Sequence, residues 1–105
     1  MNNEKGYQGW SSYSTWVVHL WMSNEEDTYR YWREKGREIS ETFPASVELV
    51  SPHQQYKTAR VALADDMNEH YKEEMPELDG MWGDLLSSAL GEVDWFEIAD
   101  SILEE

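Results

Sequence analysis

The chain has 105 residues, enough for one hydrophobic core and too few for two domains of ordinary size. It contains no cysteine, which excludes disulfides, thiolate metal sites and cysteine nucleophiles. Its formal net charge of -14 disfavours contact with nucleic acid or anionic lipid and favours contact with a basic protein surface.

The excess negative charge lies in the last part of the chain. Residues 1–60 hold eight acids and seven bases, a net of -1, whereas residues 61–105 hold fourteen acids and one base, a net of -13. We expect residues 61–105 to present an anionic surface to another protein. The plainer interpretation is that the charge keeps a chain with six Trp and six Tyr soluble.

Residues 1–9 are polar and lack the apolar run of a signal peptide. We expect them to form a flexible lead-in to a single helical domain at residues 10–105. No stretch of the chain approaches the ~20 apolar residues of a membrane-spanning helix. These features predict a soluble cytoplasmic protein with no membrane partner.

Two helices are predicted before Pro44. The first begins at one of the serines between residues 11 and 14 and ends near Met22, because its apolar residues recur at helical spacing. The second begins after Asn24, a candidate N-cap, with Asp27 completing a capping box. Its predicted apolar face consists of Thr28, Trp32, Gly36, Ile39 and Phe43.

The third helix is predicted from residue 51 to the residue before Pro76. Ser51 is a candidate N-cap, Pro52 suits the first helical position and Gln54 completes a capping box. Its expected buried face consists of Tyr56, Ala59, Leu63, Met67, His70 or Tyr71, and Met75. For residues 45–50 we predict a loop, with one short strand as the alternative, because a lone strand has no evident pairing partner.

A fourth helix is predicted with Pro76 in its first turn and Gly91 in a left-handed conformation past its end. Its apolar stripe, expected to be buried, consists of Leu78, Met81, Trp82, Leu85, Leu86, Ala89 and Leu90. Asp94 and Glu97 are expected to cap a fifth helix. The sequence therefore predicts an all-α protein with about five helices in a compact irregular bundle.

The sequence shows no recognisable catalytic machinery. Its three histidines are scattered, and phosphate-binding glycine loops, zinc-binding runs and nucleophile motifs are missing. Asp66 and His70 have the spacing of one metal half-site, but no second half-site accompanies them, so we expect a half-buried His70 hydrogen-bonded to Asp66. We predict no enzyme, no metal and no cofactor, with a metal-dependent enzyme at these two residues as an alternative.

Direct nucleic-acid binding is also not expected. Residues 29–37 interleave arginines with aromatic side chains, as stacking platforms do, but six acids on the same predicted helix cancel their charge. Residues 61–105, folded into adjacent helices, reach about one charge per 2.5 Å along a shared face. A single DNA strand carries one charge per about 3.4 Å, so this density permits mimicry of a nucleic-acid backbone.

Three segments carry distinctive motifs: Ser-Tyr-Ser-Thr-Trp-Val-Val-His-Leu-Trp-Met-Ser-Asn at residues 12–24, Tyr-Arg-Tyr-Trp at 29–32, and Leu-Leu-x-x-Ala-Leu-x-x-Val-Asp-Trp-x-x-Ile-Ala at 85–99. Together they resemble a family of small proteins from phages, plasmids and other mobile elements, over most of residues 10–103. Ser12 and Ser14 stand where that family commonly has Asn and Glu. The resemblance implies a mobile-element setting and no assigned activity.

Small acidic proteins of phages and plasmids are often inhibitors that occupy the basic nucleic-acid channel of a nuclease complex. The resemblance and the charge together predict a protein that binds and inhibits a host nucleic-acid-binding defence complex, of the anti-CRISPR or anti-restriction type, by nucleic-acid mimicry. The predicted contact residues are Asp65, Asp66, Glu69, Glu73, Glu74, Glu77, Asp79, Asp84 and Trp10.

The alternative is a non-catalytic interaction module or homodimer of a mobile element that uses aromatic rather than acidic contacts. Five tryptophans lie on predicted apolar stripes and are expected in the core, namely Trp16, Trp21, Trp32, Trp82 and Trp95. Trp10 lies outside every predicted helix, so we expect it to be an exposed anchor. Both functions place the protein in the cytoplasm of a host cell.

Overall fold

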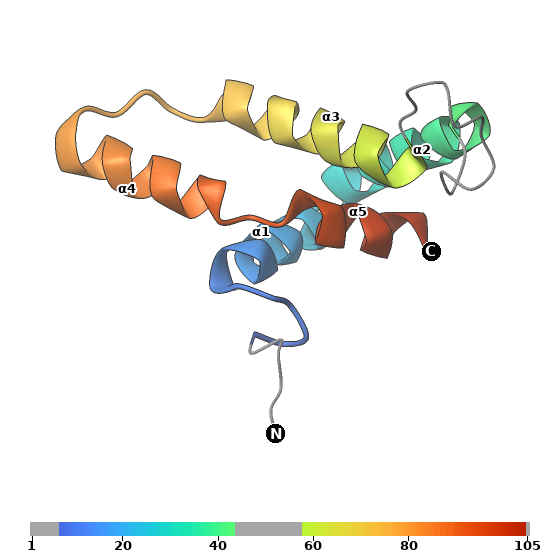
Figure 1. The fold of residues 1–105 in the computed structure, drawn as a ribbon, viewed down its shortest axis with the longest axis horizontal. Coiled ribbons are helices and arrows are strands. Elements are labelled where there is room, and N and C mark those ends of the chain that lie inside the picture. The colour runs from blue at the N-terminus through green and yellow to red at the C-terminus, as the bar shows by residue number, and fades with distance from the viewer. Residues whose placement is uncertain (1–6, 44–57, 105) are drawn as a thin grey trace, which may run out of the picture.

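The structure, a computed structural model, describes residues 7–43 and 58–104. They form five helices, in the order α1 (Tyr13–Asn24), α2 (Glu26–Thr42), α3 (Ala59–Glu74), α4 (Gly80–Gly91) and α5 (Trp95–Leu103) (Figure 1). Within these two ranges no strand occurs, and the predicted all-α bundle is confirmed. The loop or strand predicted at residues 45–50 lies outside the described residues.

The start of α1 is tied to the start of α5 by two hydroxyl groups. The Oγ of Ser12, the N-cap, accepts a hydrogen bond from the Thr15 N–H at 3.1 Å. The Thr15 Oγ1 accepts a second one from the Asp94 N–H at 2.8 Å. Thr15 is completely buried, so its hydroxyl replaces water as the partner of the Asp94 amide.

The predicted start of α2 is wrong by one residue. Asn24 is the last residue of α1, and Glu25 alone separates the two helices. An N-cap needs an extended backbone, which Glu25 has and a helical Asn24 cannot supply. The predicted capping box does not form, and Asp27 instead pairs with Arg30 at 3.3 Å.

The core lies where α2, α3 and α5 meet. Trp32, Leu63, Met67 and Ile98 are fully buried there. Gly36 lets α2 approach α5, because a Cβ at this position would lie 3.3 Å from Cγ2 of Ile102. The predicted inward faces of α2 and α3 match the structure at their centres, where Trp32, Gly36, Ile39, Leu63 and Met67 are buried.

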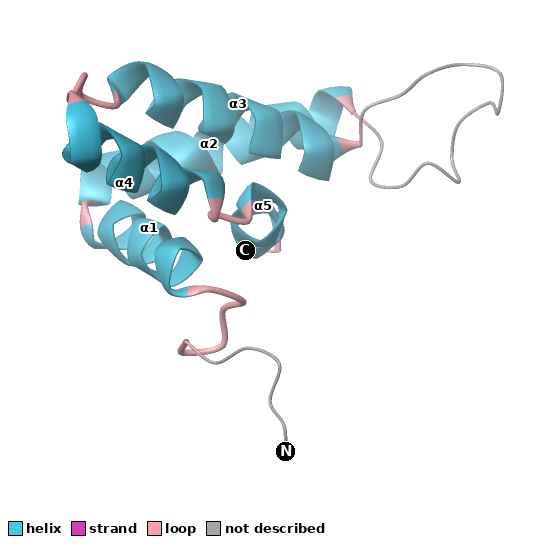
Figure 2. Cartoon of the chain, turned by 60° about the vertical axis from the view of Figure 1, so that its left-hand side comes forward, coloured by secondary structure: helices cyan, strands magenta, loops and turns pink. Residues whose placement is uncertain are grey.

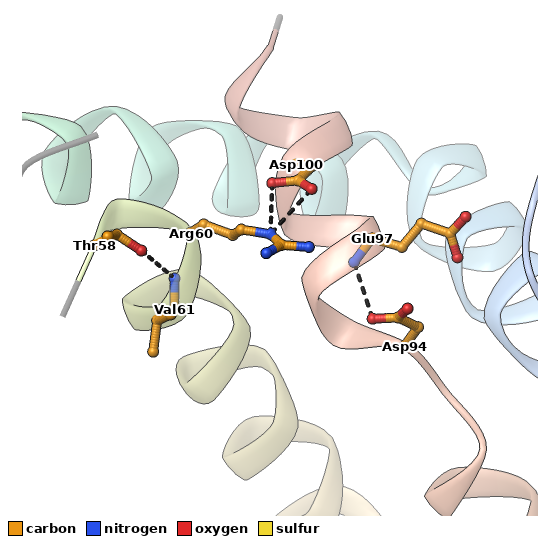
Figure 3. Close-up of polar contacts among 6 residues, drawn as sticks. All are labelled: Thr58, Arg60, Val61, Asp94, Glu97 and Asp100. Atoms are coloured by element: carbon orange, nitrogen blue, oxygen red, sulfur yellow. Dashed lines mark hydrogen bonds and ion pairs between the residues drawn. The ribbon is translucent and has the colours of Figure 1, made fainter. Parts of the chain in front are cut away.

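The third helix begins later than predicted. The Thr58 Oγ1 accepts a hydrogen bond from the Val61 N–H at 3.3 Å, so α3 starts at Ala59 (Figure 3). Thr58 is extended, with ψ at 167°, so the helical conformation of α3 begins after it. The predicted cap residues Ser51, Pro52 and Gln54, like Tyr56 of the predicted buried face, lie outside the described residues.

The fourth helix differs most from the prediction. It begins at Gly80 rather than at Pro76, after a segment without regular secondary structure at residues 76–79. Gly91 is its last helical residue and is not left-handed, whereas Gly80 has a φ of +66°. No residue of α4 is fully buried: Leu86 and Leu90 are half-buried, Leu90 against the core, and the rest of the apolar stripe is exposed, contrary to the expectation. Figure 2 shows α4 at the edge of the bundle, beside α3 and α1.

Candidate protein-binding surface

Four of the predicted contact acids share one side of α3. Successive helical residues are turned by about 100°, so Asp65, Asp66, Glu69 and Glu73 fall within an arc of about 100°. Glu69 and Glu73 are exposed and the two aspartates are half-buried. We call these four residues the α3 acidic face.

Three of the four acids of this face are unpaired within the described residues, and Lys72 lies beside the arc, about 20° outside it. Asp66, Glu69 and Glu73 form no ion pair with any side chain in the described ranges. Arg60, at the first turn of the same helix, is engaged by Asp100, with Nε 3.0 Å from a carboxylate oxygen (Figure 3). Lys72 is the base that lies nearest to the acids in the sequence of α3.

The other predicted contact acids are dispersed. Glu74 lies on α3 but outside the arc, Glu77 and Asp79 belong to the segment between α3 and α4, and Asp84 lies on α4. All four are exposed. The structure therefore brings half of the predicted acids together and separates the rest.

His70 does not pair with Asp66 as predicted. Its Nε2 lies 3.3 Å from a carboxylate oxygen of Glu74, one turn further along α3. The His70 ring packs edge-on against Trp32 and Tyr71, at centroid distances of 5.4 and 4.8 Å, and this packing fixes its orientation. Within the described part of the chain, no group of three or more His, Asp or Glu residues is placed to hold a metal ion.

Asp94, the N-cap of α5, and Glu97 and Asp100 within α5 make contacts inside the molecule. The Asp94 carboxylate accepts a hydrogen bond from the Glu97 N–H at 3.2 Å, which is the predicted helix cap (Figure 3). Glu97 does not complete a reciprocal box, because its Oε1 accepts hydrogen bonds from the N–H and hydroxyl of Ser11. With Asp100 bound to Arg60, none of these carboxylates is available to a partner without loss of an internal contact.

Tyr71 links the core to the surface. Its hydroxyl accepts a hydrogen bond from the Trp32 Nε1–H at 3.1 Å, and its ring stacks on Trp95 with 5.6 Å between centroids. Burial raises the pKa of Tyr71, against the opposite effect of the Trp32 hydrogen bond. The hydroxyl therefore stays protonated in the neutral pH range.

Of the five tryptophans expected in the core, Trp32 and Trp95 are buried and Trp16 is half-buried, but the other two are exposed. Trp10 is half-buried, with its ring 4.5 Å from that of His19, so it is not the exposed side chain that we expected. Trp21 on α1 and Trp82 on α4 were expected in the core, but 67% and 65% of their surfaces are exposed. Helical periodicity shows which residues share a face, but not whether another element covers that face.

Exposed apolar side chains also gather on the outer side of α4 and the segment before it. Met81, Trp82 and Leu85 are more than half exposed, and Leu78 is 48% exposed. On the inner side, Leu86 and Leu90 are half-buried and face the rest of the molecule. Large exposed apolar groups that lie together are typical of surfaces that bind another macromolecule.

An open groove of about 520 Å³ lies between α1, the C-terminal end of α3 and α4. Its main apolar lining residues are Val18, Trp21, Tyr71, Met75, Leu86, Leu90 and Trp95. The carboxylates of Glu25 and Glu74 also line it. We call this feature the α1–α4 groove; the sequence did not predict it, because it depends on how three helices are placed.

No helix in the described ranges is long and apolar enough to cross a membrane. Comparison of the chain with protein-family models, with curated proteins and with solved structures finds no match.

Proposed function

We propose that this protein is a non-catalytic inhibitor that binds a host nucleic-acid-binding defence complex, with the α3 acidic face occupying its basic groove. Asp65 and Glu73 are eight residues apart, about 12 Å along the helix axis. Four carboxylates over this length give one charge per about 4 Å, close to the value of about 3.4 Å for a single DNA strand. This charge spacing is the observation that supports mimicry of a nucleic-acid backbone.

Two features indicate the kind of target: the row of carboxylates on α3 and the sequence motifs. A groove that binds nucleic acid is lined by Lys and Arg, which attract a compact row of carboxylates. The resemblance of residues 12–24, 29–32 and 85–99 to mobile-element proteins favours a defence complex of the anti-CRISPR or anti-restriction type. No catalytic step is needed for such inhibition.

The experiment compares two variants with the same net charge. The α3 variant D66N/E69Q/E73Q and the α2 control E34Q/E38Q/E41Q each remove three acids, from -14 to -11. Immobilised wild-type protein and both variants are incubated with host lysate at low salt, and bound complexes are eluted by a salt step. Complexes that elute are then tested for loss of bound DNA or RNA upon addition of each protein.

We expect wild-type protein and the α2 control to capture a nucleic-acid-binding complex and to displace its nucleic acid, and the α3 variant to lose both properties. Equal capture by the two variants would show that total charge, not the α3 acidic face, drives binding. Capture without displacement would contradict inhibition by mimicry.

The alternative function, an interaction module or homodimer that uses aromatic contacts, has its own supporting observation. Trp21, Met81 and Trp82 are each more than 60% exposed, which is unusual for side chains of this size in a small domain. In that case Trp21→Ala or Trp82→Ala abolishes capture, and the α3 variant leaves it intact.

A further inference from the structure

We propose that the α1–α4 groove binds an amphipathic helix of a partner protein, with apolar residues on one side and Lys or Arg on the other. The groove is open to solvent, and aromatic side chains contribute to its lining. Tyr71 and Trp95 are stacked within it, and Trp21 is 67% exposed at its α1 side. Aromatic residues in such a position are the usual energetic centres of protein interfaces.

The shape of the groove suits a helix. Val17 or Val18 and Trp21 stand one turn apart on α1, and Leu86 and Leu90 stand one turn apart on α4. Two such rows leave a channel that accepts apolar residues at i, i+3, i+4 and i+7 of a third helix. Met75 and Pro76 line the end of the channel where α3 leads into α4.

The charge of the groove selects a basic partner. Two carboxylates, Glu25 and Glu74, line it, and neither lysine nor arginine is among its lining residues. His70 lines it too, and its Nε2 lies 3.3 Å from Glu74. Lysine or arginine beside the apolar residues of the occupant would reach these carboxylates, as in complexes of basic amphipathic helices with acidic grooves.

A second copy of this chain fits the groove poorly. The apolar helix surface that a copy offers is the outer side of α4, with Met81, Trp82 and Leu85. Asp79 and Asp84 flank that surface, so docking would bring acids against Glu25 and Glu74. Repulsion between two chains of net charge -14 opposes the same contact.

This inference does not rest on the proposed function. The α3 acidic face and the α1–α4 groove share no residue, and the two surfaces are altered by different substitutions. A protein that fails to bind a nuclease complex can therefore still bind a basic helix, and the reverse also holds.

The test uses a labelled synthetic peptide of Leu and Lys, patterned as an amphipathic helix of about five turns. Two peptides serve as controls, a scrambled one of the same composition and a Leu/Glu one with the same pattern. Fluorescence anisotropy gives the Kd of each peptide for the full chain. We expect the patterned Leu/Lys peptide to bind, and the scrambled and acidic peptides to bind at least about tenfold more weakly.

Two tryptophans of nearly equal exposure provide a matched pair of variants. Trp21 lines the groove and Trp82 does not. We expect Trp21→Ala to weaken binding of the Leu/Lys peptide by at least about tenfold, and Trp82→Ala to change it by less than about twofold. The charge pair E25Q/E74Q should weaken it by about fivefold, and E34Q/E38Q on α2 should not. Circular dichroism checks that each variant is folded.

Four results would overturn the inference. The first is failure of the patterned Leu/Lys peptide to bind. The second is equally tight binding of the scrambled peptide, which would show that charge alone drives the binding. The third is an equal effect of Trp82→Ala, which would move the contact to the outer side of α4. The fourth is a dimer in sedimentation that Trp21→Ala dissociates, which would make a second copy the occupant.

Discussion

The buried Thr15 side chain connects the start of α1 to the start of α5. We expect Thr15→Val to lower the free energy of unfolding by about 1–3 kcal/mol, because valine keeps the shape but leaves the buried Asp94 N–H without an acceptor. Thr15→Ser keeps the hydroxyl and should cost less. Urea denaturation of the three proteins measures the difference, and equal destabilisation by Val and Ser would show that the hydrogen bond contributes nothing.

Tyr71 carries a pH dependence of stability at alkaline pH. Burial raises its pKa in the folded chain above the ordinary value of 10.0, so the folded state holds the proton more tightly than the unfolded state. The resulting stabilisation is complete below pH 10 and is lost as the pH rises through the pKa of the folded state. We expect Tyr71→Phe to be less stable than wild type at neutral pH, because the Trp32 N–H loses its acceptor.

The same variant should show a flatter decline of stability above pH 10 than wild type does. Thermal unfolding at a series of pH values measures both effects. An alkaline decline that is equally steep in Tyr71→Phe would mean that other groups cause it.

At the scale of the element, the sequence predicted the buried residues correctly for helices with a single narrow apolar face. Trp32, Gly36 and Ile39 on α2 and Ala59, Leu63 and Met67 on α3 are buried as their spacing indicated. Caps were predictable where one candidate stood alone, as at Asp94. The cap of α2 was not predictable, because α1 and α2 follow each other closely and Asn24 is the last residue of α1.

Helix α4 shows why burial was harder to predict than helicity. Its apolar residues extend around more than one side, from Leu86 and Leu90 to Met81 and Leu85, and the rest of the described structure covers one edge of them. A wide apolar surface is consistent both with a core helix and with a helix that binds a partner. The sequence contains no signal that distinguishes these two cases.

A substitution at Gly83 tests how closely α4 approaches the segment before it. A Cβ at this position would collide with the carbonyl oxygen of Leu78, and this backbone atom cannot move away as a side chain can. We expect Gly83→Ala to lose protection from hydrogen exchange across α4. Because no residue of α4 is fully buried, exchange in α3 and α5 should stay as in wild type. Unchanged protection of α4 would contradict the close approach of Leu78.

At the scale of the whole molecule, the sequence predicted that residues 61–105 are acidic, but not how their acids are grouped. The structure divides them: Asp94, Glu97 and Asp100 make contacts within the molecule, four acids form the α3 acidic face, and Glu74 lines the α1–α4 groove. Glu77, Asp79 and Asp84 are exposed and dispersed. Charge alone does not distinguish these sets, because the distinction depends on the direction of each side chain relative to the other helices. The exposure of Trp21 was unpredictable for the same reason.

The salt dependence of partner binding tests whether a partner binds through the α3 acidic face. The Kd of a captured complex is measured for wild-type protein and for D66N/E69Q/E73Q in low salt and at physiological ionic strength, where charges are screened over about 8 Å. We predict that added salt weakens wild-type binding at least about tenfold and that the variant, already weak, loses most of this dependence. An affinity that is the same at both salt concentrations would contradict binding through this face.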